Sequence, residues 1–250
     1  MKTLPKKTMP FLAVALLATS PVLAQGQPVS SATTTKTSDG KTLVVPAAEQ
    51  AKGTVYYALT ERDRQVYFES NAPLENIKGQ SNKVIGFAVA SSATPGALAA
   101  GEWRMPVASM KTGIDLRDEH LASKDWLDAK ANPEVTFRLR ETKDVKEVKK
   151  TDAFASYTAT LAGDLTLHGV TKPVTIPGAT ITMLKASDAT KKVAKGDLVS
   201  IRSKFTVTLA EFGVVHPVIG DKVAKDVSLD VALYLSTLPP AQQDAPAKLK

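Results

Sequence analysis

Residues 226–235 read DVSLDVALYL, and their apolar and polar side chains alternate one by one. One face carries Val227, Leu229, Val231, Leu233 and Leu235, while the residues between them are mostly polar or small. Successive side chains in a β-strand point to opposite sides, so a period of two is typical of a strand with one buried face. The stretch therefore predicts a strand that turns one side toward a core.

The same alternation recurs through the middle of the chain. It is present in LVSIRSKFTVTL (198–209), in YTATLAGDLTLH (157–168) and after Pro133 at Val135, Phe137 and Leu139. Further candidate strands are residues 54–60, 64–70, 83–91, 98–108 and 171–184. This makes about nine segments, two of which can form one long bent strand. Long strands in sequence order predict an all-β, up-and-down antiparallel barrel, because closure removes exposed sheet edges.

One segment favours helix, namely GIDLRDEHLASKDWLDAKANP at 113–133. Asp118 and Ser123 can each cap a short helical turn by accepting from free backbone N–H groups. Pro133 ends the segment, and Leu121, Trp126 and Leu127 give it apolar side chains to bury. We therefore expect a short helical insertion in the barrel.

The interior of such a barrel can be filled by side chains or can hold one ligand. Five small residues on predicted strands would leave room inside, namely Gly86, Ala88, Ala90, Ala159 and Gly163. The alternative interpretation is that they mark bulges or tight bends in a packed core. The sequence leaves both interpretations open.

The first 24 residues, MKTLPKKTMPFLAVALLATSPVLA, have the features of a secretory signal peptide. Three lysines precede an apolar run, and small residues stand before the expected cleavage point after Ala24. The run is shorter than the roughly 20 residues that span a bilayer, and no later stretch is long enough. We expect a periplasmic or secreted protein with no transmembrane span in its mature form.

The rest of the chain divides by composition. Residues 25–52 are rich in Ser, Thr, Ala and Pro and are expected to form a flexible linker. Residues 53–238 have the size of one all-β domain, and residues 239–250 are expected to be a disordered tail.

Composition excludes several classes of function. The chain has no cysteine, which excludes thiol catalysis, Cys-type metal sites and a lipid-anchored cysteine. The formal charge is +7, of which the predicted signal peptide supplies three lysines, so the mature protein is mildly basic. Its lysines are scattered, and the densest cluster, KEVKK at 146–150, is expected in a solvated loop. We expect no nucleic-acid partner.

No catalytic or metal-binding motif stands out. His120, His168 and His216 lie too far apart in sequence for any pair to have the spacing of neighbouring ligands, so we expect no metal site. There is no G-x-S-x-G motif, and nothing singles out a pair of carboxylates. The sequence therefore does not predict an enzyme.

The large apolar residues on the predicted inner faces serve either as core or as the wall of a cavity. The candidate wall residues are Phe68, Phe87, Trp103, Trp126, Phe137, Leu161, Leu165, Phe205, Phe212, Val231 and Leu233.

Two blocks of sequence resemble the YceI-like family. The first follows the pattern T-G-x-x-x-R-D-x-H-L-x-S, matched by Thr112, Gly113, Arg117, Asp118, His120, Leu121 and Ser123. The second is GDLTLHGVTKPV, in which Gly163, Leu165, Gly169, Val170, Thr171, Lys172 and Val174 match. The resemblance covers about residues 54–237. The chain departs from the family pattern in YYALTERDRQVYFESNAP, which has no histidine, and in LAEFGVVHP, which lacks an Asp-Arg pair.

The resemblance implies an eight-stranded antiparallel, lipocalin-like barrel that binds a long-chain isoprenoid or similar amphiphilic lipid. It implies no catalytic residues and no cofactor other than such a lipid, and the sequence leaves a homodimer open. The alternative is an exported stress or interaction protein with a packed, ligand-free barrel. In HGVTKP, counting alternate residues from Tyr157 places His168 on the outer face, at a turn between two strands.

Overall fold

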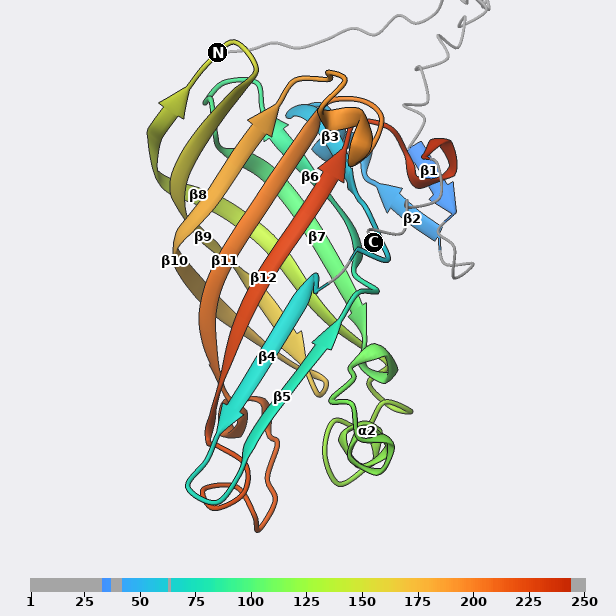
Figure 1. Ribbon diagram of the computed structural model, residues 1–250, viewed down its shortest axis with the longest axis vertical. Coiled ribbons are helices and arrows are strands. Elements are labelled where there is room, and N and C mark those ends of the chain that lie inside the picture. The colour runs from blue at the N-terminus through green and yellow to red at the C-terminus, as the bar shows by residue number, and fades with distance from the viewer. Residues whose placement is uncertain (1–32, 37–41, 63, 244–250) are drawn as a thin grey trace, which may run out of the picture. The chain divides into compact units, whose positions relative to one another are not determined.

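The computed structural model describes residues 33–36, 42–62 and 64–243, and Figure 1 shows their arrangement. The strands are β1 (Thr33–Lys36), β2 (Thr42–Val45), β3 (Gly53–Ala58), β4 (Val66–Asn71), β5 (Asn76–Ser81), β6 (Ile85–Ser91), β7 (Leu98–Pro106), β8 (Glu134–Lys150), β9 (Phe154–Leu167), β10 (Val170–Leu184), β11 (Leu198–Thr208) and β12 (Asp226–Ser236). The helices are α1 (Ala47–Gln50) and α2 (Asp115–Ala122), with 3₁₀ turns η1 (Val107–Ser109), η2 (Thr190–Lys192), η3 (Leu209–Phe212) and η4 (Pro240–Gln242). The signal-peptide prediction lies outside the described residues.

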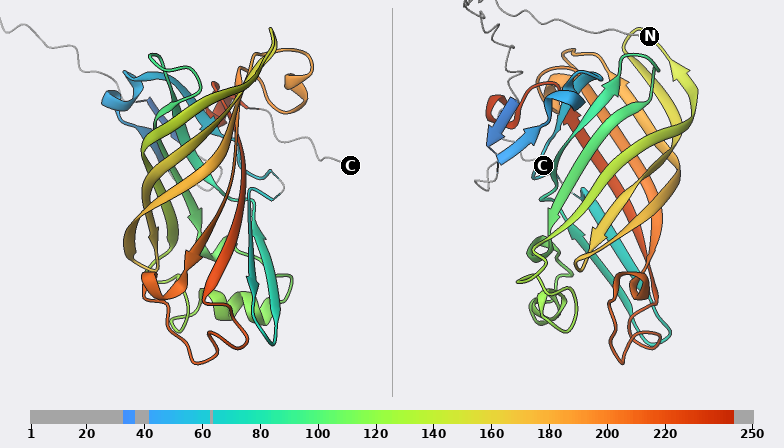
Figure 2. Two further views of the ribbon diagram at one scale, coloured as in Figure 1. Left: turned by 90° about the vertical axis from the view of Figure 1, so that its left-hand side faces the viewer. Right: turned by 180° about the vertical axis from the view of Figure 1, so that it is seen from behind.

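Eight of these strands close into an antiparallel barrel, as the sequence predicts. Their order around the barrel is β3, β6, β7, β8, β9, β10, β11 and β12, and β12 then pairs with β3. β11 and β12 pair along their whole length, whereas β12 and β3 share only two residue pairs. Figure 2 shows the barrel from two further sides. This closure leaves the central strands without a free edge.

The wall beside β12 is interrupted, because β3 ends at Ala58 and β4 begins only at Val66. β4 pairs with β12 beyond the end of β3, through pairs such as Val66 with Val231, and β5 pairs with β4. Gln65 is fully buried at the break. Its Nε2 donates to the carbonyl of Leu59 at 2.9 Å, and its Oε1 accepts from the N–H of Val84 at 3.0 Å. These bonds satisfy backbone groups at the interruption, so the β4–β5 hairpin can extend the wall.

β9 keeps the predicted alternation throughout, with buried residues at 157, 159, 161, 163, 165 and 167. It turns into β10 through His168 and Gly169, whose φ values of 51° and 74° are both positive. Since Leu167 pairs with Val170, this is a two-residue hairpin of the kind that needs two left-handed residues. The predicted turn is confirmed. The Nδ1 of His168 lies 3.2 Å from the carbonyl oxygen of Phe212.

One end of the barrel interior is filled, and we call it the packed end. Its buried side chains are Tyr56, Ala58, Ala88, Ala90, Leu98, Ala159, Ala179, Ile181, Val199 and Leu235. The alanines predicted to leave room therefore lie in close packing. The two glycines are equally confined, since a Cβ on Gly86 would lie 2.3 Å from a carbonyl oxygen and one on Gly163 2.4 Å from another. At the three alanine positions the packed-core interpretation is correct, whereas Gly86 and Gly163 lie beside the side chains of Trp103 and Phe137.

A second, smaller apolar cluster lies on the outside of β3 and β6. It contains Val45, Tyr57, Phe87, Val89 and Ala100, all of them buried. Val45 belongs to β2, within the segment that composition assigned to a flexible linker. That prediction does not hold for residues 33–36 and 42–50, which form β1, β2 and α1, and Val45 packs into the apolar cluster.

The helical insertion connects β7 to β8 at the lower end of the barrel in Figure 1. α2 begins at Asp115, so the prediction of Asp118 as a cap residue is wrong. Asp118 lies inside the helix, where its Oδ1 accepts from the backbone N–H and the hydroxyl of Thr112, each at 2.7 Å. Ser123 follows the helix, and its hydroxyl donates to the carbonyl of His120. Asp118 thus ties the helix to the preceding loop.

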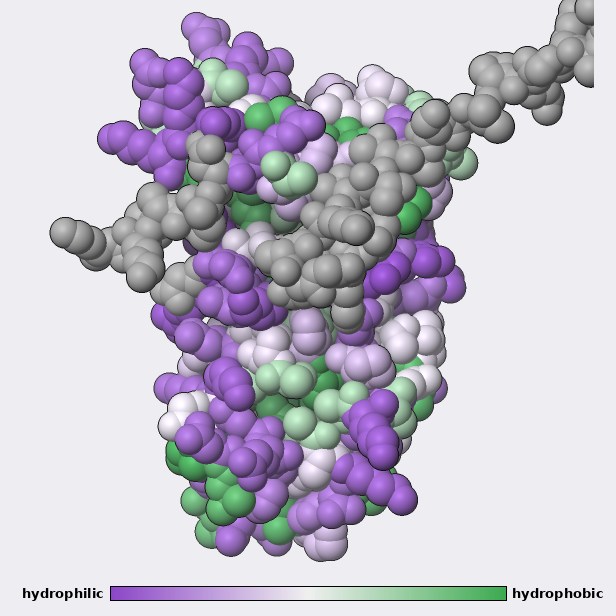
Figure 3. All heavy atoms as spheres, turned by 90° about the vertical axis from the view of Figure 1, so that its right-hand side faces the viewer, coloured by the Kyte–Doolittle hydropathy of each residue, from purple (hydrophilic) through white to green (hydrophobic). Residues whose placement is uncertain are grey.

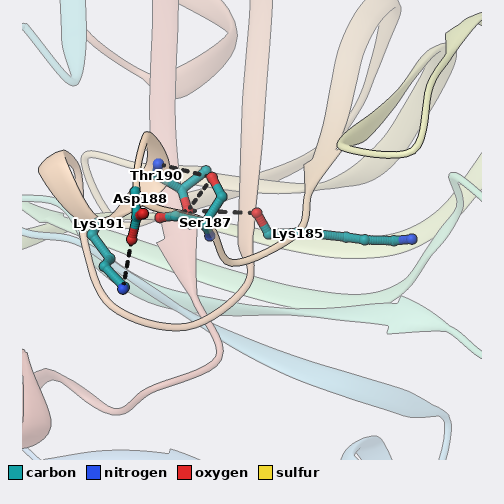
Figure 4. Close-up of polar contacts among 5 residues, drawn as sticks. All are labelled: Lys185, Ser187, Asp188, Thr190 and Lys191. Carbon is teal, nitrogen blue, oxygen red and sulfur yellow. Dashed lines mark hydrogen bonds and ion pairs between the residues drawn. The ribbon is translucent and has the colours of Figure 1, made fainter.

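At the opposite end, β8 and β9 project as a long hairpin. KEVKK at 146–150, expected in a loop, belongs instead to β8, although its side chains are exposed, Val148 included. Nearby, the β10–β11 connection is held by its own polar contacts (Figure 4). The hydroxyl of Thr190 donates to the carbonyl of Ser187 at 3.0 Å, and Lys191 pairs with Asp188 at 2.8 Å.

Candidate functional site

The other end of the barrel encloses an apolar cavity of ≈ 320 Å³. We call this the hollow end. β4, β7, β8, β9, β11 and β12 each contribute two or more residues to its wall, and α2 with the following loop lies across it. Several wall residues stay partly exposed although they are on inward faces, including Phe68, Phe205 and Leu229. Their exposure indicates that side chains do not fill this part of the interior.

Aromatic rings on this wall lie against glycines. A Cβ on Gly79 would come within 2.1 Å of the Phe68 ring, and one on Gly101 within 2.5 Å of the Trp103 indole. The ring of Phe137 lies over Gly163 in the same way. Because glycine has no side chain, each ring can lie flat along the sheet and not project into the cavity. Glycine therefore widens the cavity indirectly, through the rings it accommodates.

Polar groups on the wall are few. Ser203 is buried on β11, and the Nε1 of Trp103 is buried with no hydrogen-bond partner among the described residues. Arg104 touches the cavity, but its guanidinium pairs with Glu102 at 2.6 Å. Burial alone would raise the pKa of Glu102, yet hydrogen bonds from Arg104 and Arg138 lower it below its usual value. The strand part of the wall thus suits an apolar ligand segment.

The polar residues of the cavity gather where the insertion lies across it. Thr112, Arg117 and His120 all line this part. Arg117 forms an ion pair of 2.5 Å with Glu75 in the β4–β5 turn. Asp118 supports the same region: burial would raise its pKa, but the hydrogen bonds from Thr112 and the charge of Lys111 lower it. A polar group of a ligand would meet donors at this end of the cavity.

A ring stack also links the insertion to the β11–β12 connection. The rings of Trp126 and His216 lie 4.5 Å apart with an interplanar angle of 16°. Nδ1 of His216 accepts from the N–H of Val218 at 3.3 Å, which orients the imidazole. Three segments that are far apart in sequence therefore meet around the hollow end. They are the β4–β5 turn, the insertion that contains α2, and the β11–β12 connection.

Nine of the eleven residues predicted as cavity wall line this cavity. They are Phe68, Trp103, Trp126, Phe137, Leu161, Leu165, Phe205, Val231 and Leu233. Their contact with a ligand stays a prediction.

Phe87 and Phe212 do not line the cavity, and for these two the prediction is wrong. Phe87 faces outward into the cluster with Val45, because β6 is buried on both faces and alternation there does not identify the inner one. Phe212 is in η3, after β11 has ended, so the strand phase no longer applies to it.

Sequence reasoning missed other wall residues. Among them are Val66, Ile77, Met105, Met110, Val135, Ile201, Val207 and Leu229. Most continue the same period-two faces, so the alternation contained the signal. Alternation alone does not distinguish the inward residues that line the cavity from those in the packed core.

The three histidines do not form one site. His168 is at the β9–β10 turn, His120 is on α2, and His216 stacks on Trp126. Among the described residues, no three His, Cys, Asp or Glu side chains lie close enough to hold a metal ion. Within the same residues, no helix has the length and apolar character needed to cross a membrane.

Fold and cavity together define a class of protein: an antiparallel eight-stranded barrel with an apolar binding cavity at one end. A profile of the YceI-like domain matches residues 57–235, well over half of the chain. The chain therefore belongs to the YceI-like family.

Curated relatives are similar over part of their length. A UPF0312 protein of Pseudomonas putida (strain W619) is 33% identical over 129 residues, which cover 52% of this chain and 58% of the relative. A UPF0312 protein of Pseudomonas savastanoi pv. phaseolicola is 42% identical over 72 residues, covering 29% of this chain and 33% of the relative. The chain thus spans about half the length, or less, of these curated relatives.

Among solved structures, a polyisoprenoid binding domain from Saccharophagus degradans superimposes with a TM-score of 0.50 and 12% identity. The match covers 74% of this chain and 99% of that domain. At this level of identity the likeness shows the shared fold alone.

Proposed function

We propose that this chain is an exported lipid-binding protein that holds a long-chain isoprenoid or similar amphiphile in the cavity of the hollow end. The observation that carries the proposal is the apolar cavity on a barrel whose other end is fully packed. The family supports a binding role over a catalytic one. The structural neighbour is a polyisoprenoid binding domain, and a long apolar chain of that class suits an apolar wall.

The energetics favour a neutral hydrocarbon tail in the strand-lined part. Each buried CH₂ contributes roughly 0.8 kcal/mol, so a prenyl chain needs few polar contacts to bind tightly. A charged group there would lose its hydration without a partner. We therefore orient the ligand with its tail among Phe68, Phe205 and Leu229 and its polar end near Thr112, Arg117 and His120.

Export is part of the proposal. It is supported by the three N-terminal lysines, the apolar run that follows them and the small residues before the expected cleavage point after Ala24. We propose a periplasmic or secreted location. Fractionation of cells that produce the chain, with N-terminal sequencing of the mature form, tests it. Cytoplasmic retention with an intact N-terminus would contradict it.

The packed-barrel alternative predicts a solid interior with no void. The cavity disfavours it, because the apolar wall residues of the hollow end do not fill the space between them. An enzymatic role that uses a metal ion has no support, because no three His, Cys, Asp or Glu side chains among the described residues lie close enough to hold one.

The test is direct identification of a ligand. Native mass spectrometry of the purified chain should detect an adduct with the mass of an amphiphilic lipid, and a fluorescent prenyl probe should bind the delipidated protein. Val231→Trp, which projects into the cavity, should abolish probe binding, whereas Ser228→Trp, exposed on the same strand, should not. No adduct and no probe binding by the folded wild type would refute the proposal.

A further inference from the structure

Large apolar side chains are exposed around the hollow end. Leu74 is 72% exposed in the β4–β5 turn, Leu116 is 62% exposed on α2, and Val215 is 80% exposed in the β11–β12 connection. Ile114, just before α2, is 50% exposed. We call these four residues the apolar rim. They come from three separate segments, so no single amphipathic helix or strand explains their exposure.

The three segments are tied together. The Arg117–Glu75 ion pair joins α2 to the β4–β5 turn, and the N–H of Leu74 donates to the carbonyl of Asp221 at 2.9 Å. The stack of Trp126 on His216 joins the insertion to the same connection. These links hold the four rim side chains at one end of the barrel, the lower end in Figure 1. Figure 3 shows hydrophobic residues exposed at the lower end of one side, among hydrophilic ones.

The rim is continuous with the cavity. Arg117, His120 and Leu121 of the insertion line the cavity, while Leu116 on the same helix is exposed outward. Val214 lines the cavity and its neighbour Val215 is exposed. An apolar molecule leaving the cavity at this end would therefore pass beside exposed apolar side chains.

From these observations we infer that the apolar rim docks on the surface of a lipid bilayer, with Leu74, Ile114, Leu116 and Val215 entering its interfacial layer. The inference rests on the proposed function, since a cavity for a membrane lipid must be filled and emptied at a membrane. Shallow insertion of a few apolar side chains gives reversible attachment, as an exchange of ligand requires. Trp126, partly exposed beside the rim, has the amphipathic ring that favours this layer.

The charge of this end distinguishes docking driven by attraction to anionic lipid from docking driven by apolar side chains. The segments 72–76, 110–132 and 209–226 together contain nine acidic and six basic residues, although the chain as a whole is basic. Attraction of basic side chains to anionic lipid therefore cannot drive attachment at this end. Docking must depend on the apolar side chains, and it should be as strong on a neutral bilayer as on an anionic one.

Vesicle flotation tests the inference. The purified wild-type chain should float with phosphatidylcholine vesicles, and Leu74→Ser/Leu116→Ser should reduce the floated fraction by about tenfold or more. Val148→Ser is the matched control: Val148 is 64% exposed, but on the projecting β8–β9 hairpin at the packed end, and its loss should change nothing. Added phosphatidylglycerol should not strengthen the attachment of wild type.

The outcomes separate this inference from the proposed function. Binding of a prenyl probe in vesicle-free solution reports on the cavity alone, and the double variant should retain it. If wild type fails to float, or if the double variant floats as wild type does, the inference is wrong even when the probe binds. Attachment that needs phosphatidylglycerol, or cross-linking of the rim to a purified envelope protein without flotation, would likewise overturn it. If wild type floats but never binds the probe, the proposed function fails instead.

Discussion

Leu235 and Leu229 lie on the same face of β12, six positions apart, and they have opposite environments. Leu235 is fully buried in the packed end, whereas Leu229 is partly exposed on the wall of the cavity. One alternating strand therefore serves both ends of the barrel. The difference arises from the residues around each leucine, since alanines and valines close around Leu235 while aromatic rings lie flat against the wall near Leu229.

The two ends are also closed by different kinds of contact. The packed end is held by apolar contacts among several strands. The hollow end is held together by discrete links: the Arg117–Glu75 ion pair, the hydrogen bonds to Asp118 and the Trp126–His216 stack. Stability should therefore be concentrated at the packed end, and sensitivity to ligand and solvent conditions at the hollow end.

The largest effect should come from truncating the two leucines. Leu235→Ala creates a void in close packing and should cost about 3 kcal/mol of unfolding free energy, whereas Leu229→Ala should cost only about 1 kcal/mol. Urea unfolding of the delipidated proteins measures both. A bound prenyl probe should raise the unfolding free energy of wild type and of Leu235→Ala by similar amounts. It should raise the unfolding free energy of Leu229→Ala by less. Equal losses in the two variants would erase the distinction between the ends.

A smaller loss is expected at the interruption between β3 and β4. Gln65→Leu leaves the N–H of Val84 and the carbonyl of Leu59 without their buried partner. We expect a loss of about 2 kcal/mol in urea unfolding. Gln80→Leu, at an exposed position on β5, is the control and should be close to neutral. A neutral Gln65→Leu would mean that the interruption between β3 and β4 needs no polar support.

Local sequence patterns predict the strands and turns of this architecture. Alternation predicted β9 and β12 correctly, and the positive-φ pair His168–Gly169 fits the turn predicted at HGVTKP. These are local patterns, and they determine which side chains point inward. They also place most of the candidate wall residues on the correct face, because the cavity wall and the packed core belong to the same inward faces of the strands.

What alternation cannot predict is whether an inward face meets other side chains or empty space. Ala88, Ala90 and Ala159 suggested a cavity where the barrel is in fact packed, because they are buried in one cluster with larger side chains such as Tyr56, Leu98 and Ile181. The actual cavity is lined by large residues backed by glycine on neighbouring strands, as for Phe68 over Gly79. Phe87 was misplaced because the cover on its outer face comes from Val45, in a segment whose composition is that of a linker.

The glycine behind the Phe68 ring allows a further test of how the hollow end differs from the packed end. Gly79→Ala should force the Phe68 ring into the cavity, with a modest cost of about 1 kcal/mol and a clear weakening of prenyl-probe binding. The double variant Phe68→Leu/Gly79→Ala should recover probe binding, because a smaller side chain clears the new methyl group. Probe titration by fluorescence measures both. Unchanged probe binding in Gly79→Ala would mean that the ring position does not set the space available to the ligand.

The smallest effect is expected from pH, and only at the hollow end. The pKa of Asp118 is lowered in the folded protein, because the hydrogen bonds from Thr112 and the charge of Lys111 outweigh its burial. Its contribution to stability is therefore complete above the ordinary value of 3.8 and is lost as the pH falls through the lower, folded pKa. Hydrogen exchange of residues 111–123 should accelerate in that acidic range, while exchange near Leu235 should not. Asp118→Asn should remove this pH dependence and Asp125→Asn, at an exposed position on the same insertion, should preserve it. If acid loosens both ends together, the polar links of the hollow end do not act as a separate, titratable closure.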